Sequence, residues 1–171
     1  MHNIFTMSTF SIARIKANIG VEDSIHDARI NSLLTQTEEQ LSAPNGMTRY
    51  IIGTSGITFC PEGDFTRLPA TIIVRYLPIT TIDSVFVVRE GMDVEITHTV
   101  EYHASQTTIT LTQAIREGEV LTVTATGGFT EDTAPPKLKF IADQITALKF
   151  WNPDPTNQNI PQEIHNQINA L

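Results

Sequence analysis

The change in hydrophobic periodicity along this chain most constrains its fold. Residues 1–47 and 135–151 carry apolar side chains at the three- and four-residue spacing of amphipathic helices. Residues 48–134 instead carry the two-residue alternation of half-buried strands. Helices that flank a run of strands predict an α+β fold. We expect the N-terminal helix pair and the C-terminal helix to pack together, with an antiparallel β meander or small sandwich inserted between them.

The length of 171 residues predicts one domain. We assign residues 1–151 to this domain: a helical part (1–47), a β-rich insertion (48–134) and a helix (135–151). Residues 152–171 form an extended C-terminal tail. No apolar run approaches the roughly 18 residues of a membrane span, and the N-terminus lacks the pattern of a signal peptide. We therefore expect no membrane partner.

The N-terminal pattern predicts two helices. The first covers residues 9–18, with Gly20 as its stop. The second begins at Asp23-Ser24, where Ser24 and Asp27 resemble a capping box, and it ends before Pro44. The apolar stripes of the two helices are Ile12, Ile15 and Ile19, and Ile30, Leu33, Leu34 and Leu41.

The threonine-rich middle of the chain predicts strands at a spacing typical of an antiparallel meander or small sandwich. The candidate strands are residues 49–53, 56–60, 71–76, 84–89, 94–102, 107–112 and 120–125. The fifth alternates most regularly, with Val94, Ile96, His98, Val100 and Tyr102 on one face.

The third helix is predicted from Lys137 to Trp151, because Pro136 suits a first helical turn. Its stripe is Leu138, Ile141, Ala142, Ile145 and Leu148. The tail beyond it has three prolines and then a short apolar stripe. We predict partner docking by Trp151, Ile160, Ile164, Ile168 and Leu171. A tail folded back on its own domain, or left disordered, is the open alternative.

No constellation of residues points to catalysis. His98 points to the opposite strand face from Glu101 and His103, which argues against a metal site. Gly127-Gly128 lacks the ending of a phosphate loop and is better explained as a strand end that needs backbone freedom. The single cysteine, Cys60, fits a reducing compartment and is expected to be a small buried side chain. We therefore predict no catalytic, cofactor-binding or metal-binding residues, and no cofactor.

The formal net charge of −8 argues against a protein that grips nucleic acid through its phosphates, which requires clustered Lys and Arg. An acidic surface is compatible with DNA that passes without binding. Solubility alone is the simpler explanation of this charge.

Three stretches of the chain resemble the head–tail connector (adaptor, or head-completion) proteins of long-tailed bacteriophages. The first stretch, SIARIKANIGVEDSIHDARINSLLTQTEEQL, is similar to the helix pair that opens these proteins. The second, LPITTIDSVFVV, is similar to their proline-led strand, and the third, LTVTATGGFTEDTAPPKLKFIADQITALKFW, is similar to their C-terminal part. These stretches carry residues that specify a fold and no chemistry.

The resemblance implies a structural virion protein at the head–tail interface, assembled in the host cytoplasm. It implies a dodecameric ring adaptor between the portal protein and a downstream connector or tail protein, extending the channel through which DNA passes without specific binding. It implies no enzymatic activity. The alternatives are another connector piece, such as a tail-completion or stopper protein, and a carbohydrate-binding β-sandwich module. The second expects exposed aromatic side chains on a strand face, where this chain has threonines.

Overall fold

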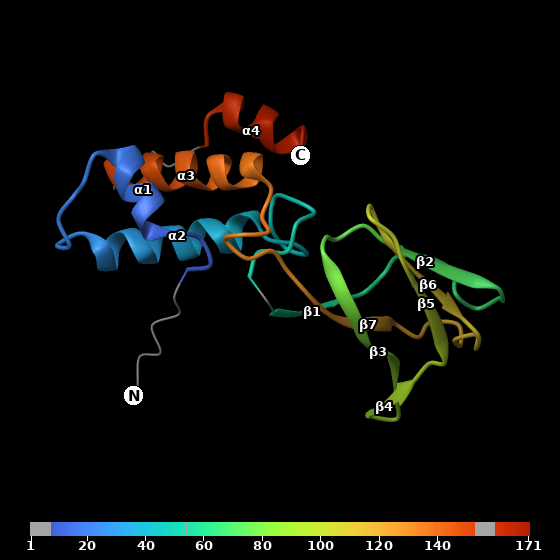
Figure 1. The fold of residues 1–171 in the computed structure, drawn as a ribbon. Coiled ribbons are helices and arrows are strands. Elements are labelled where there is room, and N and C mark those ends of the chain that lie inside the picture. The colour runs from blue at the N-terminus through green and yellow to red at the C-terminus, as the bar shows by residue number, and fades with distance from the viewer. Residues whose placement is uncertain (1–7, 54, 153–159) are drawn as a thin grey trace. The chain divides into compact units, whose positions relative to one another are not determined.

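The computed structural model describes residues 8–53, 55–152 and 160–171, and it has the predicted α+β fold (Figure 1). The chain forms two compact units. The helical unit comprises Met1–Thr48 and Phe129–Leu171, and the β unit comprises Arg49–Gly128.

The helical unit is built around its third helix. Its elements are α1 (Ile12–Ile19), α2 (Asp27–Leu41), α3 (Pro136–Trp151) and α4 (Gln162–Asn169). Helix α3 packs against each of the other three, which confirms the predicted packing of N- and C-terminal helices. Most buried core residues of α1, α2 and α3 come from the predicted stripes: Ile15, Ile19, Ile30, Leu34, Leu41, Leu138, Ile141, Ala142 and Ile145. Phe150 is also buried but was not predicted, and Ile12, Leu33 and Leu148 are only partly buried. None of the described helices is long and apolar enough to cross a membrane.

The starts of the first two helices differ from the prediction. Helix α1 begins at Ile12, because the backbone N–H groups of Thr9 and Phe10 donate to the Glu38 carboxylate at 2.9 and 2.7 Å. Helix α2 begins at Asp27, and no side chain caps it, so the capping box expected at Ser24 is wrong. The predicted stop at Gly20 is confirmed by its left-handed backbone, with φ of 72°.

The β unit contains two antiparallel sheets. Its strands are β1 (Ser55–Phe59), β2 (Ala70–Val74), β3 (Ile79–Arg89), β4 (Met92–Glu95), β5 (His98–Tyr102), β6 (Thr107–Leu111) and β7 (Leu121–Gly127). The sheet orders are β1-β7-β3-β4 and β2-β6-β5. One core cluster fills the β unit, and it includes Ile72, Val85, Val87, Ile96, Ile109, Leu111 and Val123.

Two predicted strands are corrected. Residues 94–102 are not one strand, because β4 pairs with β3 while β5 pairs with β6. The chain changes sheet at Ile96, which is fully buried and donates its N–H to the carbonyl of Val85 at 2.7 Å. Residues 49–53 form no strand; Tyr50 makes only an isolated parallel bridge with Leu77.

Candidate interaction surfaces

The residues considered for chemistry do not form a reactive site. His98 is half-buried, and its Nδ1 lies 2.8 Å from the carbonyl oxygen of Ile96. Glu101 and His103 form an exposed pair, with 3.7 Å between carboxylate and ring nitrogen. Within the described ranges, no group of three or more His, Cys, Asp and Glu side chains could hold a metal ion.

Gly127 and Gly128 are required by the backbone of the fold. A Cβ added to Gly127 would lie 2.0 Å from the carbonyl oxygen of Pro78, so this strand end admits no side chain. Gly128 has φ of 133°, a backbone conformation that favours glycine. The structure therefore confirms that these glycines serve the backbone.

An apolar surface lies where the end of α3 meets the start of α2. We call the following residues the aromatic end: Phe150, its contacts His26, Arg29 and Trp151, and Ile25, which precedes His26 in the chain. The exposed fraction is 83% for Ile25 and 62% for Trp151. The ring of Phe150 contacts Trp151 and His26 edge to face, with centroids 5.1 and 5.6 Å apart.

Arg29 completes this surface. Its guanidinium lies over the Phe150 ring, 4.7 Å from the centroid, and its Nη2 donates to the Phe150 carbonyl at 2.8 Å. Trp and Arg are among the residue types enriched in protein-binding hot spots. The sequence predicted Trp151 here, but it missed Ile25 and Arg29, because only the fold brings the two helix ends together.

The C-terminal tail contributes its last helix to the helical unit. In α4, Ile164 and Ile168 are buried, and α4 packs on α3. Lys137 Nζ donates to the carbonyl of Ala170 at 3.0 Å, which ties the end of the chain to the start of α3. Ile160 and Leu171 are partly exposed. Within a single chain, the apolar stripe of α4 therefore faces α3, and docking of the tail on another protein stays a prediction.

An ion-pair network fixes α1 to α3. Arg14 donates to both carboxylate oxygens of Asp143 at 2.7 and 2.8 Å and also pairs with Glu131. Asn18 adds a third bond to Asp143, at 2.9 Å. Because Arg14 and Asp143 are 129 residues apart in the chain, spacing alone could not predict their pairing.

Two further charged side chains are buried in the helical unit. Burial raises the pKa of Glu38, although two backbone N–H groups donate to its carboxylate. Burial lowers the pKa of Lys149, whose Nζ lies 3.3 Å from Thr37 Oγ1. Both groups join α2 to its neighbouring segments inside the unit.

The outward faces of the sheets carry hydroxyl groups. Thr58 lies opposite Thr124 in one sheet, and Thr110 lies opposite Thr71 and Thr99 in the other. These faces offer little positive charge to a phosphate backbone. Cys60 also lies on the surface, so the expectation that it is buried is wrong. It follows β1 on the outward side, where its Sγ lies 3.9 Å from Thr122 Oγ1.

Comparison with known proteins identifies relatives by fold. No protein-family model matches the chain, and no curated protein matches it by sequence. A chain in the neck of an empty gene transfer agent (GTA) particle, computed with C6 symmetry, matches with a TM-score of 0.68 and 14% identity. That match covers 95% of this chain and 88% of the other.

Two further structures agree. A chain in the virion of the native GTA particle gives a TM-score of 0.67 at 14% identity, over 95% of this chain and 88% of that one. A chain in the neck of the native GTA particle, computed with C12 symmetry, gives 0.58 at 12% identity, over 93% and 86%. At these identities the similarity establishes a shared fold across both units of the chain.

Proposed function

We propose that this protein is a structural component of a phage-like neck, a ring-forming adaptor between the portal and the tail. The observation that carries the proposal is the shared fold with chains of GTA necks over 95% of this chain. The symmetries of those necks, C6 and C12, support an oligomeric ring. The proposed ring has twelve copies in the virion and has no catalytic activity.

The aromatic end is the proposed contact between this chain and a neighbouring protein in the neck. The apolar side chains of Trp151 and Ile25 are exposed to solvent. The Arg29 guanidinium, stacked on Phe150, adds hydrogen-bond donors to the same surface. A ring requires a heterologous contact, in which one patch meets a different patch on the next copy. Such a contact would bury the aromatic end without closing the assembly as a dimer.

The C-terminal tail offers a second proposed contact, because its last residues lie beside the start of α3 while Trp151 ends that helix. Ile164 and Ile168 hold α4 on α3, while Trp151, Ile160 and Leu171 retain exposed surface. We therefore assign the docking role to these three side chains. The portal and the downstream connector or tail protein are the proposed partners.

The charge of the chain suits a channel that DNA crosses. A net charge of −8 disfavours adhesion of a polyanion, and the outward threonine faces carry no clustered Lys or Arg. We propose that the ring extends the DNA channel. DNA passes through it without specific binding, and the affinity of the ring for DNA is weak.

The proposed contact can be tested by native mass spectrometry of the full-length chain, alone and with the portal protein of its virus. Trp151→Ala combined with Ile25→Ala should shift the distribution from rings to smaller species. Val88→Ala combined with Met92→Ala is the matched control, because it also removes exposed apolar area, from the β unit. Equal loss of rings in both double variants, or in neither, would contradict the assignment.

A further inference from the structure

The two sheets of the β unit are connected along one pair of edges and separate along the other. On the connected side, the chain passes from β4 to β5, with Ile96 bonded to Val85 and the N–H of Thr112 donating to the Thr97 carbonyl at 2.9 Å. On the separate side lie β1 and β2, each at the edge of its sheet. At one end of this gap, Leu77 makes backbone bonds with Arg49 and Ile51.

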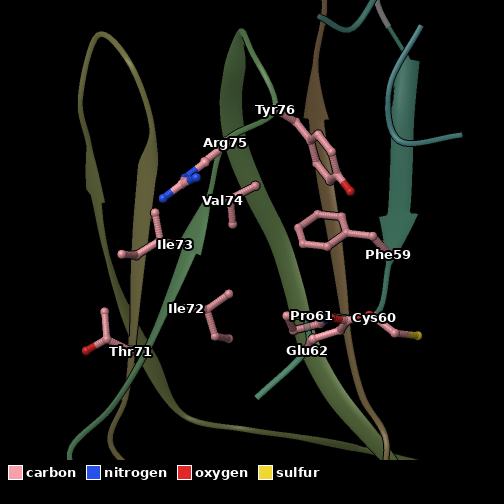
Figure 2. Close-up of a pocket in the computed structure, with 10 residues that line it drawn as sticks. All are labelled: Phe59, Cys60, Pro61, Glu62, Thr71, Ile72, Ile73, Val74, Arg75 and Tyr76. Atoms are coloured by element: carbon pink, nitrogen blue, oxygen red, sulfur yellow. The ribbon is translucent and has the colours of Figure 1, made fainter. Parts of the chain in front are cut away.

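A groove of about 350 Å³ runs between these two edge strands. Figure 2 shows β2 on one side of it and the end of β1 on the other, with Ile72, Val74 and Phe59 directed into the space. Phe59 and Tyr76 meet edge to face across the groove, with ring centroids 5.1 Å apart. Ile72 and Val74 contribute the apolar floor. Cys60 also lines the groove, with its thiol turned toward Thr122 on the outward side of β1.

Strand β2 lacks the usual protection of an edge strand. Its sequence, ATIIV, has no charged residue and no proline, and Ile73 is 52% exposed. The edge strand β4 of the other sheet, in contrast, carries Asp93 and Glu95. Among the described residues, β2 pairs with one strand, β6, and its other side is an edge. An apolar edge of this kind is a template for another strand and is normally covered.

We propose that residues 1–7 of a second copy of this chain pair with β2 in the groove and add a strand to the edge of its sheet. This inference rests on the proposed ring, which places a neighbouring copy within reach at high local concentration. The segment, MHNIFTM, contains no proline, glycine or Asp, Glu, Lys or Arg, and it includes Ile4, Phe5 and Thr6, which favour strands.

The length and anchoring of this segment fit the groove. Seven extended residues span about 23 Å, which exceeds the roughly 17 Å of a five-residue strand such as β2. The segment begins from a fixed point, because the N–H and Oγ of Ser8 both bond to Asn31 Oδ1, at 3.2 and 3.0 Å. The tail between α3 and α4 is a poorer occupant, because Pro153, Pro155 and Pro161 would interrupt a strand ladder.

The native Cys60 provides the test, since it is the only cysteine and lines the groove. Under mild oxidation, Thr6→Cys should form a disulfide to Cys60 of a second copy, seen on a non-reducing gel as a ladder of multiples of the chain mass. The cross-link should disappear when Cys60→Ser is added. Ser24→Cys, an exposed position in the same helical unit, is the matched control and should not form it.

A second measurement applies even if the isolated chain does not assemble. A synthetic peptide with the sequence MHNIFTM should slow maleimide labelling of Cys60 severalfold in a chain that lacks residues 1–7, and a scrambled peptide should not. A disulfide formed within one chain would overturn the proposal. No protection of Cys60 by the peptide, or rings that form without any cross-link, would also overturn it while leaving the proposed function standing. Absence of rings with the portal present would instead contradict the proposed function.

Discussion

Ile145 lies on α3 with none of its side chain exposed, at the centre of the helical unit. Ile145→Ala should lower the free energy of unfolding by about 2–5 kcal/mol, because it removes buried methyl groups and leaves a cavity. Chemical denaturation measures the effect. Ile25→Ala is the control at an exposed position and should change stability by less than about 0.5 kcal/mol. A loss near zero for Ile145→Ala would contradict its place in the core.

Glu119 gives the β unit a pH-dependent contribution to stability. Two hydrogen bonds from Arg89, at 2.6 and 2.9 Å, hold the pKa of Glu119 to about 2, below its ordinary value of 4.5. The unfolded chain therefore binds the proton more readily than the folded chain. Stability from this pair is present above pH 4.5 and is lost as pH falls toward 2.

The prediction from this pair concerns acid unfolding. Glu119→Gln should be less stable than the parent at neutral pH, and its stability should fall less steeply between pH 4.5 and 2. Thermal melts monitored by circular dichroism across this range measure both effects. Glu117→Gln, with an exposed side chain in the same turn, is the matched control. Parallel pH profiles for parent and Glu119→Gln would refute the assignment.

Among the secondary-structure elements, α4 differs most from its predicted role, because it packs on its own helical unit. Because Ile164 and Ile168 are buried against the helical unit, truncation after Trp151 should lower the free energy of unfolding by about 1–3 kcal/mol. Ile168→Ala should reproduce part of this loss, while Asn166→Ala, on the exposed side of α4, should not. Full stability of the truncated chain would favour a tail that docks on another protein.

Helices were more predictable from sequence than strand pairing. The stripes of α1, α2 and α3 follow a local period, so the sequence located these helices to within a few residues. The alternation from Val94 to Tyr102 also continues without a break, yet the strand bends at Ile96. That bend depends on pairing with β3 and β6, whose residues lie elsewhere in the chain.

In the candidate surfaces too, local features could be predicted from the sequence and long-range contacts could not. Trp151 could be singled out, because its place at the end of an apolar stripe is a local feature. Ile25 and Arg29 could not, since their relation to Phe150 exists only after α2 and α3 pack. The exposed position of Cys60, in contrast, could have been predicted locally: the alternation of β1 directs Ile57 inward and Thr58 outward, which places Cys60 outward too.

At the scale of the whole molecule, charge gives a prediction about DNA. The full-length chain should bind duplex DNA more weakly than about micromolar at physiological salt, because it offers no cluster of Lys and Arg to release counterions. Fluorescence anisotropy with labelled duplex at several salt concentrations measures this affinity. Tighter binding with a steep salt dependence would contradict a channel that DNA crosses freely.

The central claim, that this chain is a ring-forming adaptor of a phage-like neck, is tested most directly by electron microscopy. The full-length chain is imaged alone and mixed with the portal protein of its virus. We predict closed rings, stacked coaxially on the portal, with the twelvefold or sixfold symmetry under which the related necks were computed. Portal particles that remain bare at saturating concentrations of the chain, with no rings in either sample, would contradict the account.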